Sequence, residues 1–374
     1  MEHSFTATIK SILEKYYKDK FEEIFEKSLL IQYINEKTRS ANKGSKSRSS
    51  FANLYVIYVL VEDYVQRGYN EKGDYLNEYD GAVFSDLMKR AQSLPFGSKL
   101  QNHSFDSRLN HEFEKFFPMH DGKPVIHDSK TKRRWVNENL LIIDLNGTRY
   151  NISRAILDIV NEYVKVKTAA FKEFMSTLEQ LQKIDKTKHS EAQAFIINLL
   201  SPKVDARIFE IVSYSILKNH FRDQKILWGF DIKTLKEENL ILYKTGRTNA
   251  NDGGIDFVMK PLGRFFQVTE TLNFKKYFLD IDKIEKFPIT FVVKSDEEVG
   301  EIRKKIEKNA YKIYPIKRIV DSYMNCIEDI INVPMLKSFL DASIKKSFLP
   351  NIIEEILMQS KVEFNFEEDD DDDE

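Results

Sequence analysis

The chain has 374 residues, a formal net charge of −2 and an apolar fraction of 42%. This length accommodates two domains with sizeable cores, and a content of 27 Phe excludes a wholly disordered protein. The single cysteine, Cys326, excludes an internal disulfide framework and a cysteine-rich zinc site. The sequence has no apolar core of signal-peptide type and no apolar run of membrane-spanning length. We therefore expect a cytoplasmic protein with no membrane partner.

The acidic residues are concentrated at the C-terminal end. Residues 367–374 are eight consecutive Asp or Glu, and without them the other 366 residues carry a net charge of +6. A block of like charges repels itself and seldom folds, so we expect residues 351–374 to end in a disordered acidic tail. The rest of the chain is mildly basic, which suits an anionic partner.

Residues 1–195 are predicted to form a mainly helical domain. Apolar residues recur at helical spacing in four stretches, namely 4–34, 51–65, 86–91 and 156–182. Residues 37–50 are rich in Ser and Lys and predict a mobile loop. Residues 95–150 are rich in Gly, Pro, Asn and His and predict loops with short strands at 140–144 and 148–152.

Residues 196–350 are predicted to form an α/β domain with a mixed central sheet flanked by helices. Short β-rich runs occur at 226–230, 240–244, 289–294 and 311–316. Helical patterns separate or follow them at 192–200, 205–220, 274–286, 297–309 and 317–358. Strands that alternate with helices of this length are typical of an α/β unit.

A predicted hairpin at residues 249–270 carries the most informative side chains of the chain. It contains a glycine turn, a strand that bears Asp256, a reversal at 261–263 and a second strand that bears Gln267 and Thr269. Because strand side chains alternate between faces, Gln267 and Thr269 share one side and Glu270 lies on the other. An Asn-Asp-Gly turn is also ordinary hairpin chemistry, so a purely structural interpretation stays open.

The hairpin offers several oxygen atoms to a hard cation. The Asp256 carboxylate, the Gln267 amide, the Val268 carbonyl and the Thr269 hydroxyl would form an oxygen-rich cluster. Mg²⁺ takes oxygen ligands, commonly one or two carboxylates together with substrate phosphate. A second carboxylate could come from Glu210, which lies in the apolar helical segment that precedes the hairpin.

These segments resemble the PD-(D/E)XK nuclease superfamily, in the form found in Mrr-like and type II restriction endonucleases. The matching residues are Phe209-Glu210, Asp252-Gly253-Gly254-Ile255-Asp256 and Gln267-Val268-Thr269. The similarity covers roughly residues 200–295 and follows the family's order of helix, hairpin, helix and strand. It implies a PD-(D/E)XK-type central mixed sheet.

The resemblance also implies catalytic roles for Asp256, Gln267, Thr269 and Glu210. Asp256 would be the essential metal-binding carboxylate, and Val268 and Glu210 would also bind Mg²⁺. Gln267 takes the place of the motif's acidic residue. The chain departs from the family at Thr269, where a lysine is usual; Lys260, Lys275 and Lys276 are candidate substitutes.

Three groups of basic residues are candidates for binding DNA phosphates. They are Lys43, Lys46 and Arg48 in the predicted loop, Lys132, Arg133 and Arg134 in a basic cluster, and Lys244 and Arg247 just before the hairpin. Each group also has the plain interpretation of a solvated charged surface.

The sequence therefore predicts a Mg²⁺-dependent endonuclease for double-stranded DNA, with type II restriction as its role. Residues 1–195 would recognise the DNA, and residues 196–350 would form the catalytic domain. A restriction enzyme would act as a homodimer in a bacterial or archaeal cytoplasm, beside a companion DNA methyltransferase for the same site. The alternatives are a modification-dependent Mrr-like or repair nuclease, a catalytically decayed DNA-binding protein, and a scaffold for protein interactions.

Overall fold

The computed structural model describes residues 2–39, 41, 47–71, 79–97, 100, 105, 107–183, 189–202, 204–245, 255–270 and 274–364, without the side chains of residues 47–50, 274 and 275. The chain divides into two compact units, Met1–Glu173 and Phe174–Glu374. The boundary falls inside the long helix α8 (Ser153–Gln182). The predicted position of this helix, 156–182, agrees closely with its observed bounds.

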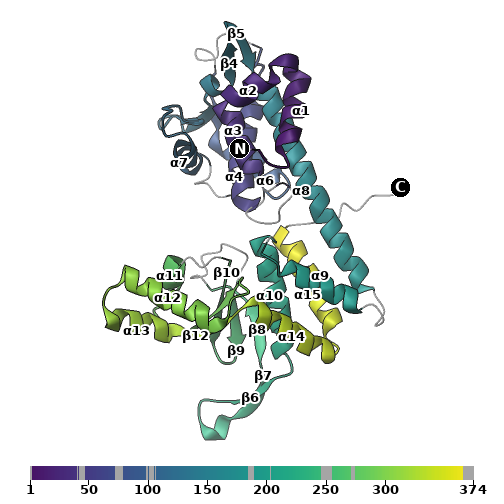
Figure 1. Cartoon of the computed structure of the whole chain (residues 1–374), viewed down its shortest axis with the longest axis vertical. Coiled ribbons are helices and arrows are strands. Elements are labelled where there is room, and N and C mark those ends of the chain that lie inside the picture. The colour runs from purple at the N-terminus through teal and green to yellow at the C-terminus, as the bar shows by residue number, and fades with distance from the viewer. Residues whose placement is uncertain are drawn as a thin grey trace. The chain divides into compact units, whose positions relative to one another are not determined.

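The N-terminal unit is mainly helical, as expected (Figure 1). Besides the first part of α8, its helices are α1 (Thr6–Tyr17), α2 (Phe21–Lys27), α3 (Leu29–Thr38), α4 (Ser47–Gln66), α6 (Phe84–Ser93) and α7 (Ser107–Phe116). Residues 47–50 were predicted as part of a loop, but they form the first turn of α4. The apolar helix predicted at 51–65 therefore begins four residues earlier than expected. Residues 42–46 of that predicted loop lie outside the described residues.

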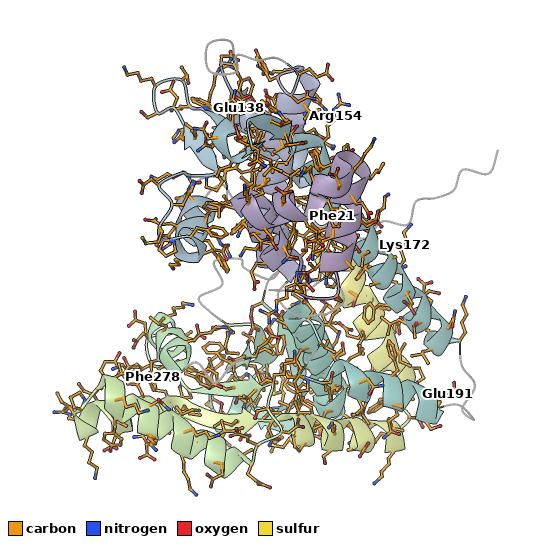
Figure 2. All side chains as sticks on the ribbon, turned by 45° about the horizontal axis from the view of Figure 1, so that its top comes forward. Phe21, Glu138, Arg154, Lys172, Glu191 and Phe278 are labelled. Atoms are coloured by element: carbon orange, nitrogen blue, oxygen red, sulfur yellow. The ribbon has the colours of Figure 1, made fainter. Side chains whose placement is uncertain are left out.

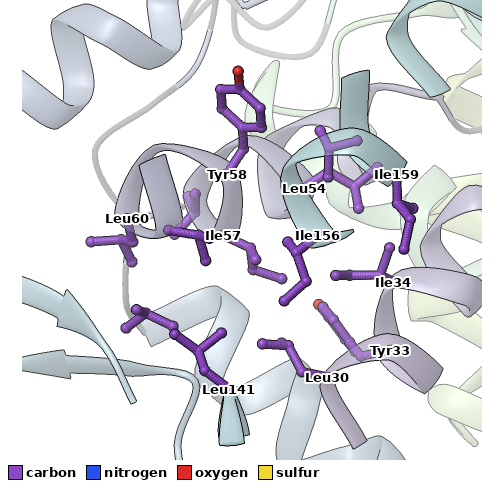
Figure 3. Close-up of a cluster of buried hydrophobic side chains, with 14 of the residues drawn as sticks. Leu30, Tyr33, Ile34, Leu54, Ile57, Tyr58, Leu60, Leu141, Ile156 and Ile159 are labelled. Carbon is purple, nitrogen blue, oxygen red and sulfur yellow. The ribbon is translucent and has the colours of Figure 1, made fainter. Parts of the chain in front are cut away.

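The core of this unit forms where α3, α4 and α8 meet. Figure 3 shows Leu30 and Ile34 of α3 packed beside Leu54 of α4 and Ile156 of α8. All four side chains are fully buried. Tyr58 of α4 lies at the margin of the cluster, and its hydroxyl points away from it (Figure 3). Burial of apolar surface at this helix junction is the main stabilising contribution in the unit.

Two small antiparallel sheets complete the N-terminal unit. One has the strand order β1 (Ala82–Val83), β3 (Arg133–Val136) and β2 (Val125–His127). The other pairs β4 (Ile142–Leu145) with β5 (Thr148–Asn151) through Asn146 and Gly147, whose φ angles are +56° and +84°. An Asn-Gly pair tolerates positive φ at both positions, which matches the twist of a two-residue hairpin.

The C-terminal unit is built on a five-stranded mixed sheet (Figure 1). In spatial order its strands are β12 (Ile327–Ile331), β11 (Ile289–Val293), β10 (Arg264–Thr269), β9 (Phe257–Lys260) and β8 (Ile241–Lys244). Strand β9 is antiparallel to both of its neighbours, β8 and β10, whereas β10, β11 and β12 are parallel. The mixed sheet predicted for this half of the chain is therefore present.

Helices cover both faces of this sheet. The register places Phe257 and Phe266 on one face, where Tyr214 of α10 (Ala206–Phe221) contacts the ring of Phe257 at 5.2 Å. It places Gln267 and Phe291 on the opposite face, where Tyr277 of α11 (Phe274–Lys283) contacts the ring of Phe291 at 4.5 Å. Helix α10 is buried on most sides because it lies between the sheet and the helices α14 (Val333–Lys345) and α15 (Leu349–Phe364).

A second apolar cluster lies on the α11 face. It involves α11 (Phe274–Lys283), α12 (Val299–Ile313) and α13 (Lys317–Cys326), which connect the parallel strands. Phe278, labelled in Figure 2, packs its ring 5.0 Å from that of Tyr323. Helix α9 (His189–Leu199) precedes α10, and a two-stranded sheet of β6 (Lys225–Trp228) and β7 (Lys236–Asn239) follows it.

Three secondary-structure predictions for this unit were wrong. Residues 311–316, predicted as a strand, include the end of α12. Residues 327–331, predicted as helix, form β12 because Ile327, Ile330 and Ile331 are buried in the sheet beside β11. Strand β7 was missed because its sequence, Lys-Glu-Glu-Asn, has no apolar residue.

Within the described ranges, none of the helices combines the length and the apolar character needed to cross a membrane.

A half-buried histidine, His220, is expected to make the stability of the C-terminal unit depend on pH. His220 stacks on Phe339 with ring centroids 4.1 Å apart, and its pKa is lowered by burial and by the charge of Lys346. The unfolded chain therefore binds the extra proton more readily. We expect stability to be lost as the pH falls from about 6.5 through the lowered pKa. Thermal unfolding between pH 7.5 and 5 should show a smaller loss for His220→Phe, and an equal loss would contradict this assignment.

Candidate active site

The candidate site lies at one end of the central sheet. Lys244 ends β8, Asp256 immediately precedes β9, Thr269 ends β10 and Lys294 immediately follows β11. Because β8 and β9 are antiparallel, β9 and β10 are antiparallel, and β10 and β11 are parallel, these four positions lie at the same end of the sheet. Sheet topology thus brings together charged residues that are up to 50 positions apart in the sequence.

Asp256 is half-buried and is attached to the neighbouring strand. Its Oδ2 accepts a hydrogen bond of 2.6 Å from the Val268 backbone N–H. Its own backbone N–H donates to the Phe266 carbonyl at 2.9 Å, and its carbonyl accepts from the Thr245 N–H at 3.0 Å. A carboxylate bonded to a backbone N–H forms a short, charge-assisted contact. The side chain predicted as the principal metal ligand is therefore held in a defined position.

Gln267 carries an unsatisfied oxygen. The side chain is 6% exposed, and its Nε2 donates to the Val268 carbonyl at 3.3 Å. Its Oε1 is buried and has no hydrogen-bond partner among the described residues. An acceptor left in this state destabilises a fold by about 1–3 kcal/mol. Such an atom calls for a specific explanation, and a cation ligand or an ordered water molecule would supply one.

This orphaned oxygen leads to a stability prediction. Replacing Gln267 with Leu removes the unsatisfied acceptor and keeps a similar volume, so we expect the free energy of unfolding to increase by about 1 kcal/mol. Urea unfolding would measure the change. Asn332 is a matched control because it is 4% exposed, but its amide donates to the Glu297 carbonyl and accepts from the Met335 N–H. Asn332→Leu should destabilise; a loss of stability in Gln267→Leu would contradict the interpretation.

Thr269 is almost fully buried at the end of β10. It is 2% exposed, and its backbone carbonyl accepts from the Lys294 N–H at 2.9 Å. Of the lysines predicted to substitute for the family's lysine at this position, Lys260 is exposed and lies over the Tyr243 ring at 4.8 Å. Lys276 is also exposed, and the side chain of Lys275 lies outside the described residues.

Lys294, which the sequence analysis did not consider, is the lysine adjacent to Thr269 across the β10–β11 pair. Its side chain is 3% exposed, and its Nζ pairs with Glu270 at 2.9 Å and donates to the Val204 carbonyl. It also lies over the ring of Phe209 at 5.4 Å. The sequence signal was present, because a lysine directly after a buried, β-branched strand lies at a sheet end.

Two predicted site residues are joined to each other. Glu210 was expected to bind metal and Lys244 to contact a phosphate; in the structure the Lys244 Nζ lies 2.9 Å from Glu210 Oε1. Only 13% of the Lys244 side chain and 11% of the Glu210 side chain are exposed. The pair therefore anchors α10 to the end of β8, on the face that α10 covers.

Only some of the predicted DNA-binding residues are described by the structure. Arg133 donates to the Gly81 carbonyl at 2.7 Å and pairs with Asp80 at 2.8 Å, and Arg134 lies over the Phe84 ring at 4.2 Å. Both arginines thus contact neighbouring parts of their own unit, whereas Lys132 is exposed. The remaining candidates, Lys43, Lys46 and Arg247, and the side chain of Arg48, lie outside the described residues.

The N-terminal unit also contains a cavity of about 890 Å³ between α1, α4 and α8. Tyr55, Tyr58, Asp158 and Asn161 are among the residues that line it, and none of the predicted basic residues does so.

Within the part of the chain that the structure describes, no group of three or more His, Cys, Asp or Glu side chains could hold a metal ion. Because Glu210 is paired with Lys244, a site for Mg²⁺ would rest on the carboxylate of Asp256 and on neutral oxygens. The buried Oε1 of Gln267 is such an oxygen, and its lack of a partner fits a cation ligand. This donor set suits Mg²⁺, which often takes few protein ligands and completes its shell with water and phosphate.

Comparison of the chain with protein-family models, with curated proteins and with solved structures finds no match. The fold and the arrangement of side chains therefore define the chain as a mixed α/β protein with a polar, charged site at one end of its sheet.

Proposed function

We propose that the chain is a Mg²⁺-dependent endonuclease that hydrolyses phosphodiester bonds in double-stranded DNA, as a type II restriction enzyme. One observation carries the proposal. The Asp256 carboxylate and the Gln267 side chain both bond to the backbone of Val268, and Gln267 keeps a buried oxygen without a partner among the described residues. An oxygen-rich pair fixed at a strand end suits a hard cation and a phosphate.

The order of elements around this pair supports the proposal. Helix α10 is followed by the antiparallel strands β8, β9 and β10, then by α11 and the parallel strand β11. The resemblance to PD-(D/E)XK nucleases implies a helix, a hairpin, a second helix and a further strand in this sequence. Fold alone does not define a function, so the proposal depends on the side chains of Asp256 and Gln267 at the strand end.

The residues would divide the chemical work as follows. Asp256 and Gln267, with the Val268 carbonyl, would hold Mg²⁺, which when bound lowers the pKa of water and neutralises charge on the phosphate. Gln267 is neutral and cannot accept a proton as a general base. The attacking water forms a bond to phosphorus and loses a proton to solvent, while the bond to the 3′ oxygen breaks and that oxygen takes up a proton. Lys294 would stabilise the end of β10 through its ion pair with Glu270 and its backbone contact with Thr269.

Digestion of a supercoiled plasmid tests this function. Wild-type protein with Mg²⁺ should give discrete linear fragments, and an excess of EDTA should prevent their formation. Methylated and unmethylated plasmids are then compared. A restriction enzyme with a companion methyltransferase should cut only the plasmid that lacks methylation at its site, whereas a modification-dependent Mrr-like nuclease should cut the methylated plasmid. Random degradation would favour a repair nuclease with little sequence specificity.

A DNA-binding protein without nuclease activity is the second candidate, and Thr269 is the observation that favours it. A buried threonine cannot supply the charge of the lysine that the family has at this position. The plasmid experiment distinguishes the two candidates, because salt-dependent DNA binding without nicking would contradict the nuclease proposal.

A further inference from the structure

The β6–β7 hairpin, residues 225–239, has an exposed apolar surface that the proposed function does not use. Figure 1 shows this ribbon, here called the arm, projecting from the rest of its unit. Phe230 is 96% exposed and Ile232 is 89% exposed. Leu227, Trp228 and Leu235 are 71%, 38% and 44% exposed. The ring of Trp228 lies 6.5 Å from that of Phe230, whereas Leu227 lies on the other face of the ribbon. Exposed apolar surface of this kind marks an interaction site.

The arm is preformed although little covers it. The carboxylate of Asp231 accepts from the N–H groups of Lys233 and Thr234, and the Thr234 hydroxyl accepts in turn from the Asp231 N–H. This reciprocal cap orders the tip between the strands. Every residue of β7 is exposed, and within the described chain β6 and β7 pair only with each other. An isolated two-stranded ribbon is marginally stable in water, so a partner that covers it would add stability.

We propose that the arm is a self-association surface, on which the arms of two copies of this chain pack against each other. The charges of the arm favour a second copy over DNA. Three lysines and three acidic residues give it no net charge; they are Lys225, Lys233, Lys236, Asp231, Glu237 and Glu238. An isologous interface places a surface against itself, which suits balanced charges, whereas a phosphate backbone attracts a net positive surface.

The exposed area is close to what a dimer needs. If each large apolar side chain carries about 200 Å² of accessible surface, the exposed fractions of Trp228, Phe230, Ile232 and Leu235 amount to roughly 530 Å² per copy. A standard protein interface buries about 800 Å² on each partner. The outer edges of β6 and β7 can supply the remaining contacts, because an unpaired strand edge is a template for pairing with another chain. The apolar side chains of the arm would thus supply the larger part of an interface of ordinary size, and its strand edges the rest.

Sedimentation analysis without DNA or Mg²⁺ tests the proposal independently of nuclease activity. Wild-type protein should be dimeric at concentrations well above about 1 µM. The variant Phe230→Glu/Ile232→Glu should have a dissociation constant raised at least about a hundredfold, because it places charges in the centre of the contact. Met119→Glu is the matched control: Met119 is also 96% exposed but belongs to the N-terminal unit. This control should remain dimeric.

A cysteine variant tests whether the arms themselves meet. The native Cys326 is buried, so Ile232→Cys introduces a single exposed thiol, and diamide should oxidise two such thiols to a disulfide-linked dimer. A monomeric wild-type chain, an undisturbed dimer in the double variant, or a lack of cross-linking would each overturn the proposal. Loss of DNA binding in the double variant, with unchanged oligomeric state, would identify the arm as a DNA contact and would also overturn it.

Discussion

Replacing Asp256 with Asn is expected to lower Mg²⁺-dependent DNA cleavage at least about a thousandfold, because removal of one preorganised charge at a reacting phosphate has an effect of this size. Asn has the same shape and keeps an oxygen that can accept from the Val268 N–H, the contact that Asp256 makes at 2.6 Å. We therefore expect the free energy of unfolding to change by less than about 1.5 kcal/mol. Plasmid nicking and urea unfolding measure the two quantities.

A surface aspartate provides the control for this experiment. Asp223 pairs with Lys346 at 2.7 Å, and 38% of its side chain is exposed. Asp223→Asn should cleave DNA at the wild-type rate. If Asp256→Asn cleaves as fast as this control, Asp256 does not hold the metal and the proposed site is wrong. If Asp256→Asn is unfolded, its loss of cleavage reports only on stability. Asp256→Glu then serves as the second variant, and its cleavage rate is compared after an unfolding curve has shown that it folds.

Replacing Lys244 with Met is expected to destabilise the C-terminal unit by about 3–5 kcal/mol, because it leaves the Glu210 charge buried without its ammonium partner. The two side chains lie 2.9 Å apart and are 13% and 11% exposed, so solvent cannot replace the lost contact fully. The double variant Glu210→Leu/Lys244→Met should recover most of this loss, because buried ion pairs can often be replaced by apolar residues. Urea unfolding of the three proteins measures the effect.

Lys346→Met is the matched control for the buried pair. Lys346 and Asp223 are 48% and 38% exposed, and exposed pairs contribute about 0–1 kcal/mol. A Lys244→Met variant that loses no more stability than this control would refute the structural role of the pair. The double variant also has a functional readout. If it folds and still cleaves DNA, the pair only anchors α10; if it folds and is inactive, Glu210 or Lys244 contributes to the reaction or to DNA binding as well.

Strong local patterns predicted many of the elements correctly. The apolar spacing near residues 156–182 predicted α8, and the β-branched run at 289–294 predicted β11, because their periodicities are long or distinctive. Patterns failed where burial alone decided the structure. Residues 327–331 contain both acidic and apolar side chains and form a strand only because a parallel neighbour buries their isoleucines.

In the candidate site, too, some features follow from local sequence and others from contacts between distant segments. The sequence by itself determined the hairpin, with Asp256 at the start of one strand and Gln267 on the next, because turn residues and alternating side chains are local properties. Only the tertiary structure decided that Glu210 pairs with Lys244 and that Lys294 lies beside Thr269. These contacts depend on strand order and on helix packing across the sheet, which single-strand patterns do not encode.

Long-range packing also explains why Gln267 is buried with an unsatisfied oxygen. Its amide was predicted as one oxygen among several, and its position on the strand follows from the sequence alone. Its near-complete burial, and the lack of a partner for its oxygen among the described residues, arise because β11 pairs beside β10 and α11 covers that face of the sheet. Local sequence thus determined which groups the hairpin presents, whereas long-range packing decided which of them are buried, paired or left with an unsatisfied oxygen.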